Sequence, residues 1–298
     1  MFVYSIGGIV VYITSDFPIS VKDSFLSAGL HCSCPVTCKS SSFLDEEAFY
    51  VSIISCSRGY SVLDKIFSLQ RTDLNTTAEG YLQQFYLADD KKDLLWTVAI
   101  NHAFSRFEYS LYPHNGKKKL AVTDPYGPIL SLFLLQHSFI HHQGLIIHAA
   151  GGSIKGKGIA FTAPSGTGKS TLSQLLVQSP HNRLFSEERL IVRLVDKQWH
   201  VWGTPWHGEG NIARNESVPL SALVFLKQSQ ITKITPLSSS DGLHRLIQTA
   251  SIPWYSVEWT DKGLVLCESL IKEIPMFELA FRPDQSAIEV VEHLAAVL

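Results

Sequence analysis

The sequence lacks a basic excess, has only five cysteines, and contains no apolar run long enough to span a bilayer. Its 25 lysines and arginines stand against 27 aspartates and glutamates, which gives a net charge of −2. Nucleic-acid-binding proteins usually carry a clear basic excess, so this balance argues against a nucleic-acid partner. The apolar run at residues 129–140 is shorter than the roughly 20 residues that a membrane helix needs, so no membrane partner is expected.

The N-terminal stretch MFVYSIGGIVVYITSD is apolar but has no positively charged leader of the kind that opens a secretory signal. Its β-branched residues and glycine pair predict two short strands or one kinked strand instead. We therefore expect a soluble, cytoplasmic protein.

Three of the cysteines, Cys32, Cys34 and Cys38, follow His31 in the segment HCSCPVTCK. A zinc site generally needs four ligands, most often arranged as two separated pairs. Four ligands on one short loop make a poor zinc scaffold, so reduced thiols are the favoured interpretation and a metal site is the alternative. Cys56 and Cys267 lie in apolar sequence and are expected to be packing residues.

The two halves of the chain differ in hydrophobic periodicity. Up to about residue 115, alternating runs are separated by turn signals such as DDKKD at residues 89–93 and Asn115–Gly116, which predict antiparallel hairpins. A helix predicted from Pro128 to Gly144 links this part to a pattern of strand, loop, helix and strand. We predict a β-rich N-terminal domain at residues 1–120, for recognition of an acceptor or partner, and an α/β catalytic domain at residues 121–298.

The segment GIAFTAPSGTGKSTLSQLLVQ combines a strand, a glycine-rich loop and a helix, which is the context of a phosphate-binding loop. Glycines let backbone N–H groups turn towards a phosphate, and the helix N-terminus adds the positive end of its dipole. Lys169 is expected to reach the β and γ phosphates, and the Ser170 hydroxyl is expected to hold Mg²⁺. The predicted nucleotide-binding residues are Ser165, Gly166, Thr167, Gly168, Lys169, Ser170 and Thr171.

The first glycine of the usual loop motif is replaced here by Ala163. Alanine fits the exit from a strand if its φ angle is negative, so the departure is mild. The sequence has no Asn-Lys-x-Asp segment of the kind that GTPases use, and no transporter signature loop. Asp196 is the nearest candidate for a strand-ending aspartate, but its flanking alternating runs predict the tip of a hairpin.

The loop and its surroundings resemble the catalytic half of HPr kinase/phosphorylase. The resemblance rests on HAAGGSIKGKGIAFTAPSGTGKSTLSQLL followed by RLFSEERLIV, and the loop is also similar to that of ATP-dependent phosphoenolpyruvate carboxykinase. In HPr kinases a histidine precedes the loop and an Asp-Asp pair follows it. Here His148 lies 21 residues before Lys169, and Glu187 lies 18 residues after it. The resemblance is close over residues 145–215 and implies an HPr-kinase-like, PEP-carboxykinase-like P-loop domain of the α/β class. The N-terminal half is more similar to HPr-kinase-related proteins encoded with peptide-modifying enzymes than to the N-terminal domain of the long HPr kinases. Some of those related proteins phosphorylate a serine of a ribosomally made peptide.

This resemblance implies an ATP- and Mg²⁺-dependent kinase that acts on a hydroxyl, with serine expected, of a peptide or small protein. It also implies that Lys169 takes part in transfer, that Glu187 is the catalytic base, and that Glu188 helps to hold the metal, with the reverse order of the two glutamates open. Glutamate keeps the charge of aspartate but moves the carboxylate by about a bond length, and a shift near 1 Å can cost on the order of a hundredfold in rate. The alternative is a polar turn with both glutamates in solvent.

His148 and Arg214 complete the predicted catalytic set. His148 ends an apolar strand, where it is either a buried, hydrogen-bonded residue or a contact for a phosphate or the acidic pair, and either contact would shift its pKa. Arg214 lies in a glycine-rich loop between two strands and is predicted to clamp a phosphate. Three further residues of that loop are candidates for contact with the acceptor or the base: Trp206, His207 and Glu209.

Two other functions remain open from the sequence. The chain could be a nucleotide-binding regulatory or scaffold protein with little turnover, or a small-molecule kinase that acts on free hydroxy amino acids. The resembled family often forms rings, which leaves a homo-oligomer open. Because phosphate loops recognise phosphates, the motif does not distinguish ATP from GTP.

Overall fold

The computed structural model describes residues 2–15, 49–54, 61–69, 72–86, 90–112, 132–164, 166–206, 208 and 210–298. It shows a mixed α/β protein with two sheets and two compact units, the first made mainly of residues up to His141 and the second mainly of residues from His142 onwards. Several sequence predictions lie outside the described residues: the boundary near residue 120, the hairpin at Asn115–Gly116, the helix start at Pro128, the Cys32–Cys38 cluster, Cys56, Ser165, His207 and Glu209.

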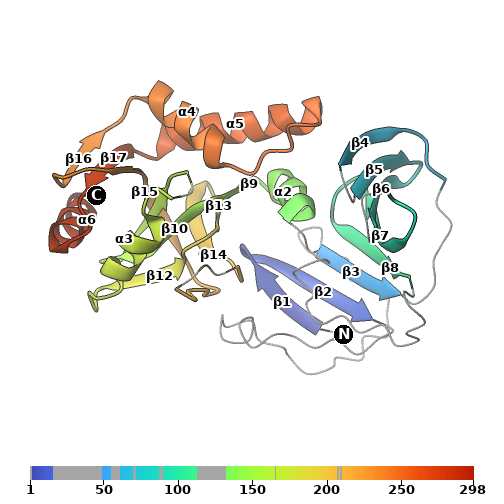
Figure 1. Cartoon of the computed structure of the whole chain (residues 1–298), viewed down its shortest axis with the longest axis horizontal. Coiled ribbons are helices and arrows are strands. Elements are labelled where there is room, and N and C mark those ends of the chain that lie inside the picture. The colour runs from blue at the N-terminus through green and yellow to red at the C-terminus, as the bar shows by residue number, and fades with distance from the viewer. Residues whose placement is uncertain are drawn as a thin grey trace. The chain divides into compact units, whose positions relative to one another are not determined.

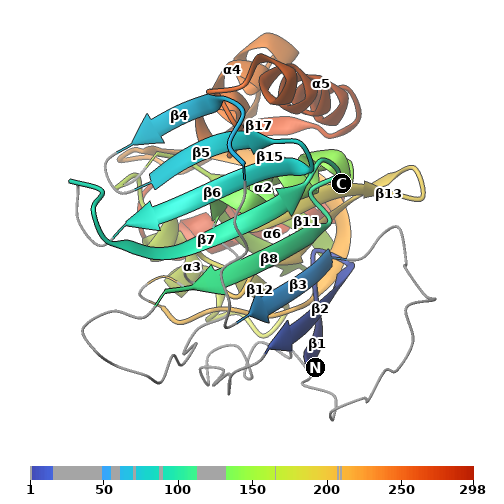
Figure 2. The ribbon, with the colours of Figure 1, turned by 90° about the vertical axis from the view of Figure 1, so that its right-hand side faces the viewer.

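The first sheet has eight strands in the order β1-β2-β3-β8-β7-β6-β5-β4, which Figure 2 shows face-on. The strands are β1 (Phe2–Ile6), β2 (Ile9–Ser15), β3 (Phe49–Ile54), β4 (Lys65–Leu69), β5 (Thr72–Thr77), β6 (Gly80–Tyr86), β7 (Leu94–Asn101) and β8 (Arg106–Leu111). β4 to β8 pair in antiparallel fashion, whereas β3 is parallel to β2 and β8. The hairpin predicted around DDKKD is confirmed, and of the two alternatives for the N-terminal stretch the structure shows two short strands.

Helix α2 (Leu132–His141) packs within this first unit. The His137 ring stacks on Phe104 with centroids 4.5 Å apart, and the buried Ser138 hydroxyl donates to the Phe104 carbonyl at 2.8 Å. The helix ends three residues before the predicted Gly144, because Gln143 turns the chain with a φ of 59°.

The second sheet carries the glycine-rich segment. It has nine strands, with β12-β10-β11-β15-β14-β13-β9 in sequence across it, and β17 pairing with both β15 and β16. The strands are β9 (Gly144–Ile147), β10 (Ala149–Ile154), β11 (Lys157–Thr162), β12 (Asn182–Ser186), β13 (Leu190–Val195), β14 (Gln198–Gly203), β15 (Ser217–Gln228), β16 (Lys233–Pro236) and β17 (Met276–Phe281). The helices are α3 (Lys169–Leu176), α4 (Ser239–Thr249), α5 (Val257–Glu273) and α6 (Gln285–Val297); α4 and α5 lie together in Figure 1.

Three parallel strands bring three segments of the chain to the same edge of the second sheet. β11 is parallel to β15, and β15 is parallel to β17. Parallel neighbours end at the same edge of a sheet, which is the edge where open α/β sheets bind their ligands. The loop after β11, Gln228 at the end of β15 and Phe281 at the end of β17 therefore meet at one edge.

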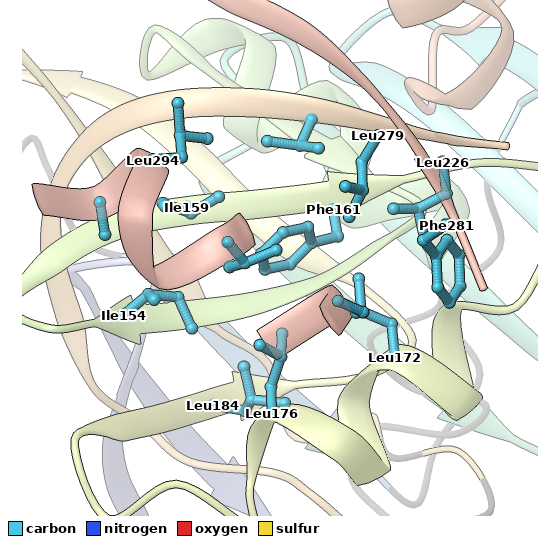
Figure 3. Close-up of a cluster of buried hydrophobic side chains, with 14 of the residues drawn as sticks. Ile154, Ile159, Phe161, Leu172, Leu176, Leu184, Leu226, Leu279, Phe281 and Leu294 are labelled. Atoms are coloured by element: carbon cyan, nitrogen blue, oxygen red, sulfur yellow. The ribbon is translucent and has the colours of Figure 1, made fainter. Parts of the chain in front are cut away.

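Helices α3 and α6 cover one face of this sheet. Leu172 and Leu176, one helical turn apart, lie on the same side of α3 and pack with Phe161 of β11 and Leu294 of α6 in the buried cluster of Figure 3. Truncating a fully buried leucine to alanine typically costs about 2–5 kcal/mol, so this cluster fixes the position of α3 relative to the strands.

Helix α4 covers the opposite face. Successive residues of a strand point to opposite faces; Val224 and Leu226 belong to the cluster under α3 and α6, while Phe225 between them lies beneath Arg245 of α4. The Arg245 guanidinium carbon is 5.9 Å from the centre of the Phe225 ring.

Cys267 on α5 is buried, which confirms the prediction that it is a packing residue. Burial raises the pKa of its thiol to about 12.

Three segments with the aliphatic stripes of core-packing helices, residues 241–254, 261–274 and 286–297, overlap α4, α5 and α6, and the apolar segment 222–228 lies in β15. The hairpin predicted at Asp196 is also confirmed: β13 and β14 pair antiparallel, and Asp196 and Lys197 take φ angles of 49° and 64° in the two-residue turn. None of the helices within the described ranges is long and apolar enough to cross a membrane.

Candidate active site

The glycine loop (residues 163–168) joins β11 to α3 and depends on its two glycines. Gly166 has a φ of 78° and Gly168 a φ of 107°, a region that residues with a Cβ rarely enter. Ala163 is not among the described non-glycine residues with positive φ, and its methyl group is buried in the cluster under α3. The replacement of glycine by alanine therefore puts no strain on the backbone at this position.

The N-terminus of α3 presents unsatisfied backbone donors. Its N-cap is Gly168, which has no side chain to accept them, and the first turn contains no acidic residue. The loop itself is held in place: the Thr167 hydroxyl donates to the Pro164 carbonyl at 2.8 Å, and Gln228 Nε2 donates to the Gly166 carbonyl at 3.1 Å. An ordered loop before a helix N-terminus with open donors suits an anion.

Lys169, the first residue of α3, is buried with 7% of its surface exposed. Its Nζ donates to the carbonyl of Ala163 at 2.8 Å and lies 3.5 Å from that of Pro164. Burial lowers the pKa of this amine, the charge of Glu188 acts to raise it, and that of Arg189 lowers it. The ammonium group thus lies at the start of the glycine loop, within the electrostatic field of Glu188.

A tight turn after β12 separates the two glutamates. The buried Ser186 hydroxyl accepts the backbone N–H groups of Glu188 at 3.2 Å and Arg189 at 3.3 Å. The Thr204 hydroxyl donates to the Arg189 carbonyl at 2.7 Å. Anchored at both ends, the turn directs Glu187 inwards and Glu188 outwards.

Glu187 is only 2% exposed, so it is not part of a solvated polar turn. Its Oε1 accepts the Ile212 N–H at 3.3 Å, and its Oε2 has no hydrogen-bond partner among the described residues. Gly208 and Gly210 lie directly against the carboxylate; a Cβ at Gly210 would be 2.4 Å from Oε2. These glycines allow the segment before Ile212 to close over the carboxylate.

Glu188 lies on the other side of the turn, with 38% of its side chain exposed. Its Oε1 is 3.5 Å from His148 Nδ1. Burial lowers the pKa of Lys169, of His148 and of Arg189, and the charge of Glu188 acts against that lowering in all three. Of the two glutamates, Glu188 is the one that the structure brings together with His148 and Lys169.

His148 sits at the junction of β9 and β10. Its backbone N–H donates to the Thr249 carbonyl at 2.8 Å, and its carbonyl accepts the Thr162 hydroxyl at 3.0 Å, so both main-chain groups are fixed. Burial lowers the pKa of the ring, the positive charges of Lys169 and Arg189 lower it further, and Glu188 acts in the opposite direction.

Arg189 was missed by the sequence analysis. It is partly buried next to Glu188, and burial lowers the pKa of its guanidinium against the opposing effect of that carboxylate. The available signal was its place directly after the acidic pair. Arg214, by contrast, is predicted in the catalytic set; its N–H donates to the Phe185 carbonyl at 2.8 Å, while its side chain is exposed and makes no ion pair with a described residue.

The described residues contain no group of three or more His, Cys, Asp and Glu side chains that could hold a metal ion. Magnesium in phosphotransfer sites takes only one or two protein ligands, with phosphates and waters filling the remaining positions. Ser170 on the first turn of α3 and the half-exposed Glu188 fit that modest requirement. ATP with Mg²⁺ is thus chemically compatible with the residues present.

Comparison with known proteins gives one family match and a distant structural likeness. The family model described as "SynChlorMet cassette protein ScmC" matches residues 129–294, which is more than half of the chain. No curated protein matches the sequence. Among solved structures, the Hpr(Ser) kinase/phosphatase from Coxiella burnetii is similar at 13% identity and a TM-score of 0.31, over 51% of this chain and 94% of that one. A likeness at this level assigns no function to the present chain.

Proposed function

The chain belongs to the family of the SynChlorMet cassette protein ScmC, and from that premise we propose that it is an ATP- and Mg²⁺-dependent phosphotransferase. The proposed reaction transfers the γ-phosphoryl group to a hydroxyl, with serine of a peptide or small protein as the acceptor. The resemblance of the loop sequence to HPr kinases supports this class of reaction.

One observation carries the proposal. Lys169, at the start of the glycine loop, lies in the electrostatic field of Glu188, and Glu188 in turn lies 3.5 Å from His148. Phosphoryl transfer to a hydroxyl uses, besides the metal and the phosphate-binding loop, a cation that contacts phosphate and a carboxylate that can receive a proton. Here Lys169 and Glu188 interact electrostatically.

The roles of the residues follow from their positions. Backbone N–H groups of the glycine loop and of the first turn of α3 bind the phosphates. Lys169 exchanges its bond to the Ala163 carbonyl for one to a phosphate oxygen. Magnesium, when bound by Ser170 and the phosphates, supplies charge neutralisation.

We place acceptor activation at Glu188. The acceptor oxygen attacks the γ phosphorus, its proton passes to the Glu188 carboxylate, and the bond to the departing ADP oxygen breaks. His148 orients Glu188, and Arg189 adds positive charge beside it. Glu187, buried beneath the segment around Gly210, holds the turn in position. The sequence prediction placed the base at Glu187 and the metal contact at Glu188; this proposal instead places the base at Glu188 and gives Glu187 a structural role.

The test measures transfer of radiolabelled γ-phosphate from ATP to serine peptides, with wild type and Lys169→Ala compared side by side. Loss of one phosphate-binding cation is expected to reduce transfer by about 100-fold or more. Lys157→Ala, at the other end of β11, is the matched control and keeps wild-type activity.

Other outcomes distinguish the competing functions. ATP binding without transfer to any acceptor would overturn the kinase proposal in favour of a regulatory nucleotide-binding protein. Transfer to free serine but not to peptides would restrict the acceptor to small molecules.

A further inference from the structure

A pocket of about 440 Å³ opens beside the glycine loop and extends to the ends of β15 and β17, which the proposed chemistry does not use. Three elements line it, all at the carboxyl edge of the parallel strands. The lining residues come from the loop and α3 (Thr167, Gly168, Thr171), from the end of β15 (Gln228, Ser229, Gln230) and from the end of β17 (Phe281, Pro283).

We propose that this pocket binds the base and ribose of the nucleotide. The inference rests on the proposed function, since it concerns the non-reacting part of the same phosphoryl donor. Its volume falls within the range of about 300–1,000 Å³ that small-molecule sites usually have. It lies at the edge where doubly wound sheets bind ligands.

The position of the pocket fits the direction of a bound nucleotide. The pocket shares Thr167, Gly168 and Thr171 with the phosphate-binding segment. Lys169, His148 and Glu188 do not line it. In a phosphate loop the lysine contacts the β and γ phosphates, and the loop amides cradle the α and β phosphates. With the γ phosphate towards Lys169 and Glu188, the opposite end of the nucleotide extends into the pocket.

The chemistry of the lining suits a neutral, planar ligand rather than a further phosphate or an acidic peptide. None of the described residues that line the pocket carries a charge. Phe281 supplies an aromatic floor, which can pack against a base. Gln228 and Gln230 carry side-chain amides, each with both donor and acceptor atoms, and such groups match the edge of a nucleobase.

The walls of the pocket are connected to the phosphate-binding segment. Gln228 Nε2 donates to the Gly166 carbonyl at 3.1 Å, and the Ser229 N–H donates to the Phe281 carbonyl at 3.1 Å. A Cβ at Gly168 would lie 3.0 Å from Phe281 Cζ, so the loop packs closely against the ring. The pocket is therefore preformed, and its position relative to the phosphate-binding segment is fixed.

The experiment compares two probes, ATP-Mg²⁺ and inorganic tripolyphosphate, by calorimetric titration. Gln230→Trp and Pro283→Trp introduce a large side chain at exposed rim positions of the pocket. Each is expected to weaken ATP binding by at least about tenfold and to leave tripolyphosphate binding unchanged, because only ATP has a group to place there. Gln178→Trp, an exposed glutamine outside the pocket, is the matched control.

A second measurement locates the base directly. Photolysis of bound 8-azido-ATP followed by peptide mapping is expected to label residues 228–230 or 281–283. Label found elsewhere, with ATP binding intact in both tryptophan variants, would overturn the pocket assignment while leaving the phosphotransferase proposal standing. If Lys169→Ala weakens neither probe, the phosphate site itself is wrong and both proposals fail together.

Discussion

The Nδ1 atom of His148 lies 3.5 Å from Oε1 of Glu188. The two residues are far apart in the chain: His148 lies between β9 and β10, and Glu188 follows β12 in a turn held by the Ser186 hydroxyl. Both main-chain groups of His148 are hydrogen-bonded to fixed partners. The contact is thus set by the sheet and the turn, and through it the carboxylate acts on the pKa of the ring.

Removing the charge of Glu188 is expected to lower the pKa of His148. The carboxylate favours the protonated ring, whereas burial and the positive charges of Lys169 and Arg189 favour the neutral one. In Glu188→Gln only the lowering influences remain. Titration of the His148 ring by NMR checks this shift, with Glu187→Gln as the control, and an unchanged titration in Glu188→Gln would contradict the contact.

His148 is also expected to contribute to acid sensitivity. Because its pKa in the folded state lies below the ordinary value of 6.5, the unfolded chain binds the proton more readily. The resulting loss of stability begins as the pH falls through about 6.5 and is complete below the folded-state pKa. His148→Gln should therefore lose less stability than wild type between about pH 7.5 and pH 5.5, as measured by thermal unfolding. Equal losses in the two proteins would show that this ring does not contribute.

Local pattern predicted much of the second unit, and the reasons can be traced to particular residues. The alternation around Asp196 has a period of two, and this period alone identifies a hairpin. The mild effect of alanine at position 163 could also be predicted, because it depends on one backbone angle of that residue. Neither inference needs a partner that is distant in sequence.

The roles of the acidic pair could not be predicted in the same way. Which glutamate faces the loop is decided by Ser186, by Thr204 and by the close approach of Gly210, and the last two belong to a later part of the chain. The pocket beside Phe281 likewise requires β11, β15 and β17 to be adjacent. Such contacts depend on sheet order, which the sequence pattern does not specify.

Glu187 is expected to be important for stability, unlike Glu188. Glu187→Ala leaves a cavity and removes the acceptor of the Ile212 N–H, so a loss of about 2–4 kcal/mol is expected. Glu187→Gln keeps the shape and the acceptor, and it should cost much less. Urea unfolding checks both, with Glu188→Ala as the matched control on the partly exposed side of the turn. Equal destabilisation by Glu187→Ala and Glu188→Ala would contradict the inward position of Glu187.

Restoring the usual glycine at Ala163 is expected to reduce stability without improving nucleotide binding. The Ala163 methyl group is 2% exposed within the cluster under α3, and a buried methyl or methylene group contributes about 0.8 kcal/mol. Glycine would also add backbone freedom to the unfolded chain, at roughly 0.5–1 kcal/mol, for a total loss of about 1–2 kcal/mol.

The affinity of Ala163→Gly for ATP-Mg²⁺ should match that of wild type, because Lys169 bonds to the main-chain carbonyl at residue 163 and not to its side chain. The contrasting variant is Gly168→Ala, in which a Cβ would enter a φ of 107° and approach Phe281; it should weaken ATP binding. Calorimetric titration and urea unfolding of both variants separate these effects. A gain in affinity in Ala163→Gly would contradict this expectation and would mean that Ala163, rather than the position of the Glu187 and Glu188 carboxylates, limits the affinity for ATP-Mg²⁺.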